Sequence, residues 1–212
     1  MIKNDQIKLT EEIVETAYRL LINKLANGGI QAKNESSFQL ELGYILKTLG
    51  QLYEFRVVDK FHLELETYIQ LNGQSIKSKS ERARVDLLIY YKDDKTTTKA
   101  AIELKFFKKE NHREPNNRYD VFKDLSNIEL YKENGIDICY FILSTDHSHY
   151  VNQENYSADT MDFDFRHGKE YKSGTVLQYR TEKPYGPELK LNRDYKFTWD
   201  KVNELYFLKI KM

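Results

Sequence analysis

The sequence has little of what fibrous, membrane-spanning and disulfide-stabilised proteins need. Its 212 residues include 3 prolines and 9 glycines, too few for a collagen-like or low-complexity chain. No stretch approaches the roughly 18 apolar residues of a transmembrane helix, and one cysteine, Cys139, excludes an internal disulfide. Residues 1–6 lack the apolar run of a secretory signal. A cytoplasmic protein without membrane partners is therefore expected.

Net charge is also absent, because 33 Lys and Arg residues balance 33 Asp and Glu residues. A neutral chain is unlike proteins that simply coat nucleic acid. The charge is nevertheless uneven: residues 73–123 carry 13 basic and 8 acidic side chains, and residues 124–164 carry 1 and 9. We expect any basic face in the first segment, and we expect the second to face away from a bound polyanion.

The hydrophobic residues, 40% of the chain, follow helix and strand periods in turn. The order of the expected elements is helix, helix, three strands, helix and strand, as in an α/β domain with a mixed central β-sheet flanked by helices. Residues 1–145 would form this core, and residues 146–212 a loop-rich and β-strand extension of the same domain. The expected helices cover 10–27, 36–50 and 115–134, and the expected strands 53–71, 83–91, 99–107, 136–144, 195–199 and 204–211.

Two acids, Asp86 and Glu103, interrupt strands that otherwise read as buried. An ionised carboxylate on a core strand is costly unless it has a partner or a metal ion. Lys105 follows Glu103 by two residues, so both side chains project from one face. A hairpin turn near residues 93–94 would bring Asp86 beside Glu103 and create a site suited to magnesium. The alternative is that Glu103 and Lys105 form a surface pair on an edge strand.

Asp86, a spacer and Glu103-Leu104-Lys105 together resemble the PD-(D/E)xK nuclease superfamily. The order of elements over about residues 36–145 agrees with this resemblance, although Val85 stands where the motif name has proline. The resemblance implies a restriction-endonuclease-like core (αβββαβ), here with an extra N-terminal helix and a C-terminal β-rich extension. It also implies a restriction or defence enzyme that hydrolyses DNA phosphodiester bonds.

The resemblance further implies a role for each matching residue. Asp86, Glu103 and the backbone carbonyl of Leu104 would hold Mg²⁺ or Mn²⁺, and Lys105 would orient or deprotonate the attacking water and stabilise the phosphate. An acid from the preceding helix often assists the metal, and Glu41 is the best match here. From their positions in the chain, the expected phosphate contacts are Lys79, Arg82, Lys108 and Arg118.

Other functions remain open at the level of sequence. A nuclease-like fold can bind nucleic acid or a protein without cutting, and RNA can replace DNA as the substrate. The chain can act as a homodimer or as the nuclease subunit of a larger complex. A cleavage assay with Mg²⁺ or Mn²⁺ and a chelator control separates catalysis from binding.

Overall fold

The expected α/β architecture is present in the computed structural model, which describes residues 2–75 and 79–212. No helix within these ranges is long and apolar enough to cross a membrane. The helices are α1 (Lys3–Ala26), α2 (Glu35–Gln51), α3 (Glu114–Glu133) and α4 (His149–Asn152), with 3₁₀ turns η1 (Lys109–Asn111) and η2 (Ala158–Thr160). The strands are β1 (Lys60–Gln70), β2 (Arg82–Lys92), β3 (Thr97–Phe107), β4 (Ile138–Thr145), β5 (Glu170–Tyr171), β6 (Val176–Leu177), β7 (Leu189–Lys190), β8 (Tyr195–Lys196), β9 (Trp199–Val202) and β10 (Leu205–Lys211).

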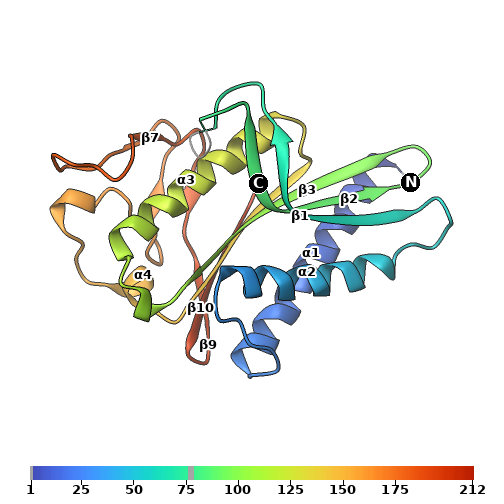
Figure 1. Cartoon of the computed structure of the whole chain (residues 1–212), viewed down its shortest axis with the longest axis horizontal. Helices are drawn as coiled ribbons and strands as arrows, with labels where there is room; N and C mark the ends of the chain where they lie inside the picture. The colour runs from blue at the N-terminus through green and yellow to red at the C-terminus, as the bar shows by residue number, and fades with distance from the viewer. Residues whose placement is uncertain (1, 76–78) are drawn as a thin grey trace.

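Six strands form one mixed sheet in the order β1-β2-β3-β4-β10-β9 (Figure 1). The first three form the expected antiparallel meander. Strands β3 and β4 are parallel, as a strand–helix–strand crossover through α3 requires. The C-terminal extension supplies β10 and β9 to this sheet, and its shorter strands pair as β5–β8 and β6–β7. The prediction of a mixed sheet flanked by helices is confirmed.

Each face of the sheet has its own hydrophobic core. Helices α1 and α2 cover one face through residues such as Leu21 and Phe38. Helix α3 and the C-terminal extension cover the other face through residues such as Phe122 and Phe197. Strands buried on both faces read as nearly continuous apolar runs, which is the pattern of β4.

The β1–β2 hairpin bends where Glu66 meets Asp86. Glu66 has φ +53°, a left-handed conformation that is uncommon for a non-glycine residue. On β2, Leu87 packs in the core beneath α1 and α2, whereas Val85 packs in the core beneath α3. Residues two apart normally share a face. Beyond the bend, the outer half of the hairpin, which is the half nearest the loop joining β1 to β2, therefore packs on the α3 face of the sheet. Distortions of this kind often re-aim a side chain.

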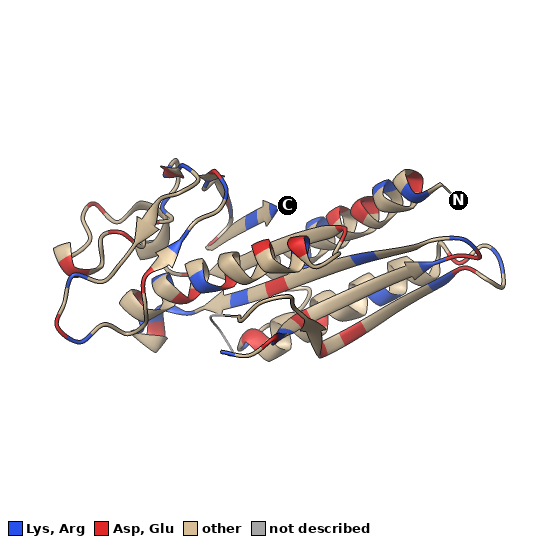
Figure 2. Ribbon diagram, turned by 90° about the horizontal axis from the view of Figure 1, so that it is seen from above, with Lys and Arg blue, Asp and Glu red and all other residues tan. Residues whose placement is uncertain are grey.

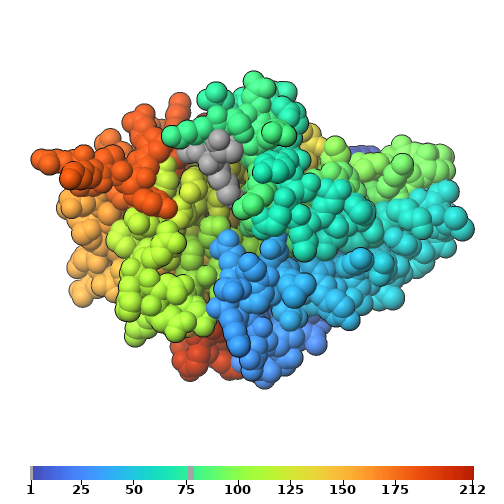
Figure 3. Space-filling view, in the orientation of Figure 1, coloured from blue at the N-terminus to red at the C-terminus, as the bar shows by residue number. Residues whose placement is uncertain are grey.

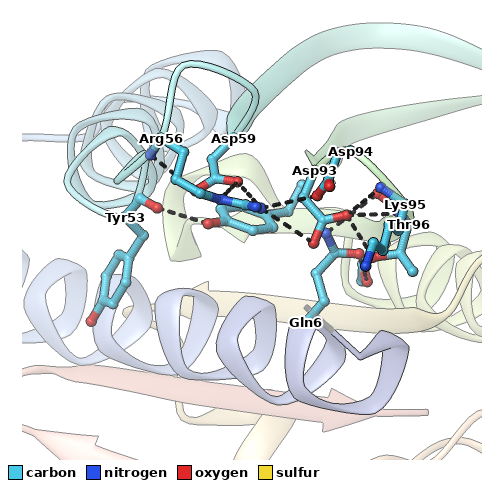
Figure 4. Close-up of polar contacts among 10 residues, drawn as sticks. Gln6, Tyr53, Arg56, Asp59, Asp93, Asp94, Lys95 and Thr96 are labelled. Atoms are coloured by element: carbon cyan, nitrogen blue, oxygen red, sulfur yellow. Dashed lines mark hydrogen bonds and ion pairs between the residues drawn. The ribbon is translucent and has the colours of Figure 1, made fainter.

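Polar contacts hold the turn that joins β2 to β3, at the end of this hairpin away from Asp86 (Figure 4). Asp93 Oδ1 accepts hydrogen bonds from the backbone nitrogens of Lys95 and Thr96, each at 2.8 Å. Arg56 bonds Asp59 at 2.7 Å and links the loop before β1 to this turn. Such aspartate-capped turns fix strand register, and this register decides which residues of β2 and β3 lie opposite one another.

The two N-terminal helices begin at different residues from those expected. Helix α1 starts at Lys3 rather than Thr10, and its first turns bury the polar residues Gln6 and Thr10. Apolar periodicity cannot detect this part of the helix, because Gln6 is buried against the Thr98 hydroxyl, 2.9 Å away. Helix α2 is capped by Asn34 and Ser37 rather than by Ser36. It continues through Gly50, where a Cβ would lie 2.2 Å from the Phe61 ring.

Candidate active site

Asp86 and Glu103 meet where the sheet divides. Pairing between β2 and β3 runs as far as Leu87 opposite Ile102, whereas pairing between β3 and β4 continues to Phe107 opposite Thr145. Asp86 and Glu103 are the next residues on their strands, so they lie side by side at the point of separation. The prediction that they lie on adjacent strands is confirmed.

The main chain of Leu104 is satisfied by side chains at this division. Its N–H donates to Asp86 Oδ2 at 2.6 Å, and its carbonyl oxygen accepts from Lys105 Nζ at 2.9 Å. In an intact sheet these groups would face a neighbouring strand. Asp86 and Lys105 therefore occupy the place that the backbone of β2 has left.

Glu103 is buried on an interior strand. Its exposed fraction is 1%, and that of Asp86 is 8%, so Glu103 is not part of a surface pair on an edge strand. Glu103 Oε1 accepts a hydrogen bond from the Tyr131 hydroxyl of α3 at 2.6 Å. Burial and the nearby Glu103 carboxylate both raise the pKa of Tyr131, which keeps this hydroxyl a donor.

Lys105 is held by two further acids that the sequence did not identify. Its Nζ lies 2.8 Å from Asp124 Oδ2 of α3 and 3.4 Å from Glu35 Oε1 of α2. The Lys105 side chain is 12% exposed and that of Asp124 1%. Burial opposes the charge, but the surrounding carboxylates outweigh it and raise the pKa of Lys105 well above its usual value; these are Asp124, Glu35, Asp86 and Glu103. Lys105 is therefore a fixed ammonium group.

The acid of α2 that contacts this cluster is Glu35, whereas the sequence favoured Glu41. Glu41 lies six residues further along, about 9 Å down the helix axis and about 240° around it. Glu35 is the first residue of α2 and is directed at the site by the way the helix docks on the sheet. Burial raises the pKa of Glu35, Lys105 opposes that rise, and Asp86 adds to it. Only tertiary placement distinguishes these two glutamates.

Gln39 braces the bend in the hairpin beside the site. Its Nε2 donates to the Asp86 backbone oxygen at 2.7 Å and to Glu66 Oε1 at 3.0 Å. Arg84 Nε pairs with the other Glu66 oxygen at 2.9 Å. These contacts hold the Asp86 backbone in place, so its carboxylate is positioned by packed groups rather than by a free loop.

The expected phosphate contacts differ in their surroundings. Arg118 is 2% exposed; it donates to the Thr160 and Phe163 carbonyls, and its guanidinium lies 3.6 Å from the centre of the Tyr156 ring. Its proposed role as a surface phosphate contact is therefore wrong, because the guanidinium serves the packing of the C-terminal extension. Lys108 is half-buried and pairs with Glu110 at 3.1 Å.

Lys79 and Arg82 are exposed on the outer half of the β1–β2 hairpin. Arg82 lies over the Tyr68 ring at 5.4 Å. Lys77, a further basic residue two positions before Lys79, lies outside the described residues. Figure 2 shows basic and acidic residues interspersed along the same helices and strands.

A pocket of about 220 Å³ opens beside Lys105. It is bounded by Glu35, Lys105 and Phe106, with Arg113 just before α3 and Asn117 and Asp120 within that helix. Figure 3 shows the surface hollowed where α2, α3 and the β1–β2 hairpin come together. We call this space the Lys105 pocket.

The donor set at the division of the sheet suits a hard divalent cation. Two carboxylates, from Asp86 and Glu103, and the Leu104 carbonyl are all oxygen ligands, and magnesium is commonly held by one or two carboxylates with water completing its shell. The carbonyl has a second lone pair besides the one that Lys105 engages. Among the described residues, no group of three or more His, Cys, Asp or Glu side chains is arranged to bind a metal.

No protein-family model matches this chain, and neither a curated protein nor a solved structure is significantly similar to it. A function is therefore inferred from the site itself.

Proposed function

We propose that this protein is a metal-dependent endonuclease of the restriction or defence type, built on a restriction-endonuclease-like core and acting on DNA. The observation that supports the proposal is the convergence of Asp86, Glu103 and Lys105 where β2 and β3 separate. The element order αβββαβ, running from α2 to β4, agrees with the order expected from the resemblance to the PD-(D/E)xK nuclease superfamily.

Each residue would have a distinct task in phosphodiester hydrolysis. Asp86, Glu103 and the Leu104 carbonyl would hold Mg²⁺ or Mn²⁺, which lowers the pKa of bound water and polarises a phosphoryl oxygen. Lys105, fixed by Asp124, places positive charge where negative charge develops on the phosphate. The Tyr131 hydroxyl orients Glu103, and Gln39 fixes the backbone of Asp86.

Plasmid cleavage with Mg²⁺ or Mn²⁺ tests this proposal directly. The wild-type chain should cut, EDTA should stop cutting, and Asp86→Asn should need a higher metal concentration because one anionic ligand is lost. Asp200→Asn, which changes an exposed aspartate on β9, is the matched control. Nucleic-acid binding without metal-dependent cutting of any duplex, single strand or RNA would favour a non-catalytic binding module.

The two glutamates of α2 should differ in their effect on cleavage. Glu35→Gln removes a partner of Lys105 that is 45% exposed, so we expect up to about a fivefold loss of rate, equivalent to ~1 kcal/mol for such a pair. Glu41→Gln should leave the rate unchanged. Single-turnover cleavage by both variants measures this, and the reverse order of effects would restore Glu41 to the site.

Lys79 and Arg82 should contribute to affinity through phosphate contacts. Each phosphate neutralised adds about −0.9 to the slope of log affinity against log salt on duplex DNA, so the Lys79→Ala/Arg82→Ala double variant should flatten it by up to ~2. Lys92→Ala/Lys95→Ala makes the same charge change at the far end of the β2–β3 hairpin and should leave the slope as it is. Equal slopes for wild type and the first variant would mean that the DNA-binding surface lies elsewhere. Residues 165–212 would then be the first candidates.

A further inference from the structure

A second pocket adjoins the Lys105 pocket around the end of β3. It has a volume of about 350 Å³, within the range of small-molecule sites. Phe106 lines both spaces and directly follows Lys105. Lys108 of the segment after β3 and Asp146 of the segment after β4 also line it, so it lies at the carboxyl ends of two parallel strands, where α/β sheets bind ligands. We call it the Ala32 pocket.

The lining of the Ala32 pocket combines apolar and basic side chains. Ile30, Ala32 and Phe106 contribute apolar surface, and Lys33 and Lys108 contribute the cations. The Phe106 ring is supported by Phe38, with ring centres 5.3 Å apart. An aromatic wall with cations beside it is the combination that binds a base and the phosphates on either side of it.

We propose that the Ala32 pocket receives a nucleobase of the same strand whose phosphodiester group lies at Lys105. The inference rests on the proposed nuclease function and specifies its substrate: an unpaired nucleotide, in a single strand or at a frayed or flipped position. A base inside a pocket cannot remain stacked and paired in a duplex. The burial of Glu103 and Asp86 agrees with this, because a flexible strand reaches a recessed site more easily than a rigid double helix.

One charge in the lining opposes a polyanion. Asp146 carries a carboxylate, but its Oδ1 accepts the Lys109 backbone N–H at 2.8 Å. This hydrogen bond turns one oxygen toward the end of β3. Lys33 and Lys108 outnumber Asp146 in the lining, and Lys108 is also paired with Glu110, which lies outside the lining.

Equilibrium binding in EDTA tests the pocket without requiring cleavage. The probe is a fluorescein-labelled single-stranded DNA of about 12 nucleotides, inside the usual range of single-strand sites, with its matched duplex as competitor. We expect the single strand to bind at least about tenfold more tightly than the duplex. Ala32→Phe, which fills the pocket, should weaken single-strand binding by about tenfold or more, the effect of losing one stacked base. Ala158→Phe, the same change at an exposed position, should not.

Two further measurements distinguish a blocked pocket from a misfolded variant. Phe106→Leu keeps an apolar side chain but loses the aromatic face, and it should weaken binding of the single strand only. A probe with one abasic position should bind the wild type less tightly yet bind Ala32→Phe as the intact probe does. Equal affinity for single strand and duplex, with Ala32→Phe unaffected, would overturn the pocket while leaving metal-dependent cleavage intact. Selective binding without any metal-dependent cleavage would instead overturn the proposed nuclease function.

Discussion

Replacing Lys105 with alanine is expected to slow metal-dependent cleavage by about 10²–10³-fold, the usual loss when one preorganised charge-stabilising group is removed. The ammonium group is already fixed by Asp124 and the Leu104 carbonyl before substrate arrives. Its effect should therefore fall on the transition state, and DNA affinity should change little. Single-turnover rates and fluorescence anisotropy measure the two quantities separately.

Lys99→Ala is the control for this prediction, because Lys99 is an exposed lysine on the same strand. It should cleave at the wild-type rate. Parallel losses of rate and affinity in Lys105→Ala would make Lys105 a binding residue only. A wild-type rate would remove it from catalysis altogether.

Lys105→Met is expected to lower the free energy of unfolding by about 3–5 kcal/mol, the cost of breaking a buried ion pair from one side. Asp124 is 1% exposed and would lose its ammonium partner. Lys105→Met/Asp124→Leu removes both charges of the closest pair and should recover part of this stability, because well-packed apolar replacements are often neutral, whereas Asp86 and Glu103 still lack the ammonium group. Urea unfolding, with the slope checked for constancy, measures both variants.

An exposed ion pair provides the comparison. Lys172 and Asp194 lie 2.7 Å apart with side chains 82% and 59% exposed, so Lys172→Met should destabilise the protein far less than Lys105→Met. A Lys105→Met variant as stable as the wild type would contradict a buried pair. The double variant should stay inactive even where its stability returns, which separates folding from catalysis.

The sequence predicted the strand residues of the site because charge among apolar neighbours is unusual on a strand. Asp86 and Glu103 each break such a run, and the turn at Asp93 sets the register that joins them. Whether Glu103 sat on an edge strand could not be read from the chain, since β3 becomes interior only when β4 pairs beside it.

The helix residues of the site were harder to recognise, although one of them carried the same signal. Asp124 lies between Val121 and Ile128 at spacings of three and four, with Tyr131 next on the same stripe. An acid on that apolar stripe of α3 was a core candidate. A net charge summed over residues 124–164 does not separate this buried acid from the others. In the structure Asp124 contacts Lys105, and the orientation of the whole segment relative to a bound polyanion stays a prediction.

The burial of Arg118 depends on a partner that lies far from it in the sequence. Its guanidinium packs on Tyr156, which lies in a segment with weak periodicity. No local pattern links the two residues, so a basic side chain on α3 read as a surface contact. Glu35 was missed for a related reason: its place at the start of α2 matters only after that helix has docked.

The bend at Glu66 and Asp86 makes one hairpin a shared wall of both hydrophobic cores. Phe61 and Leu87 belong to the core beneath α1 and α2, and Ile69 and Val85 to the core beneath α3. Neither layer can loosen without moving the strand that carries Asp86. The cooperativity of folding and the integrity of the acidic pair are thus coupled, and a partly unfolded molecule would lose the arrangement of Asp86 and Glu103 before it lost its remaining structure.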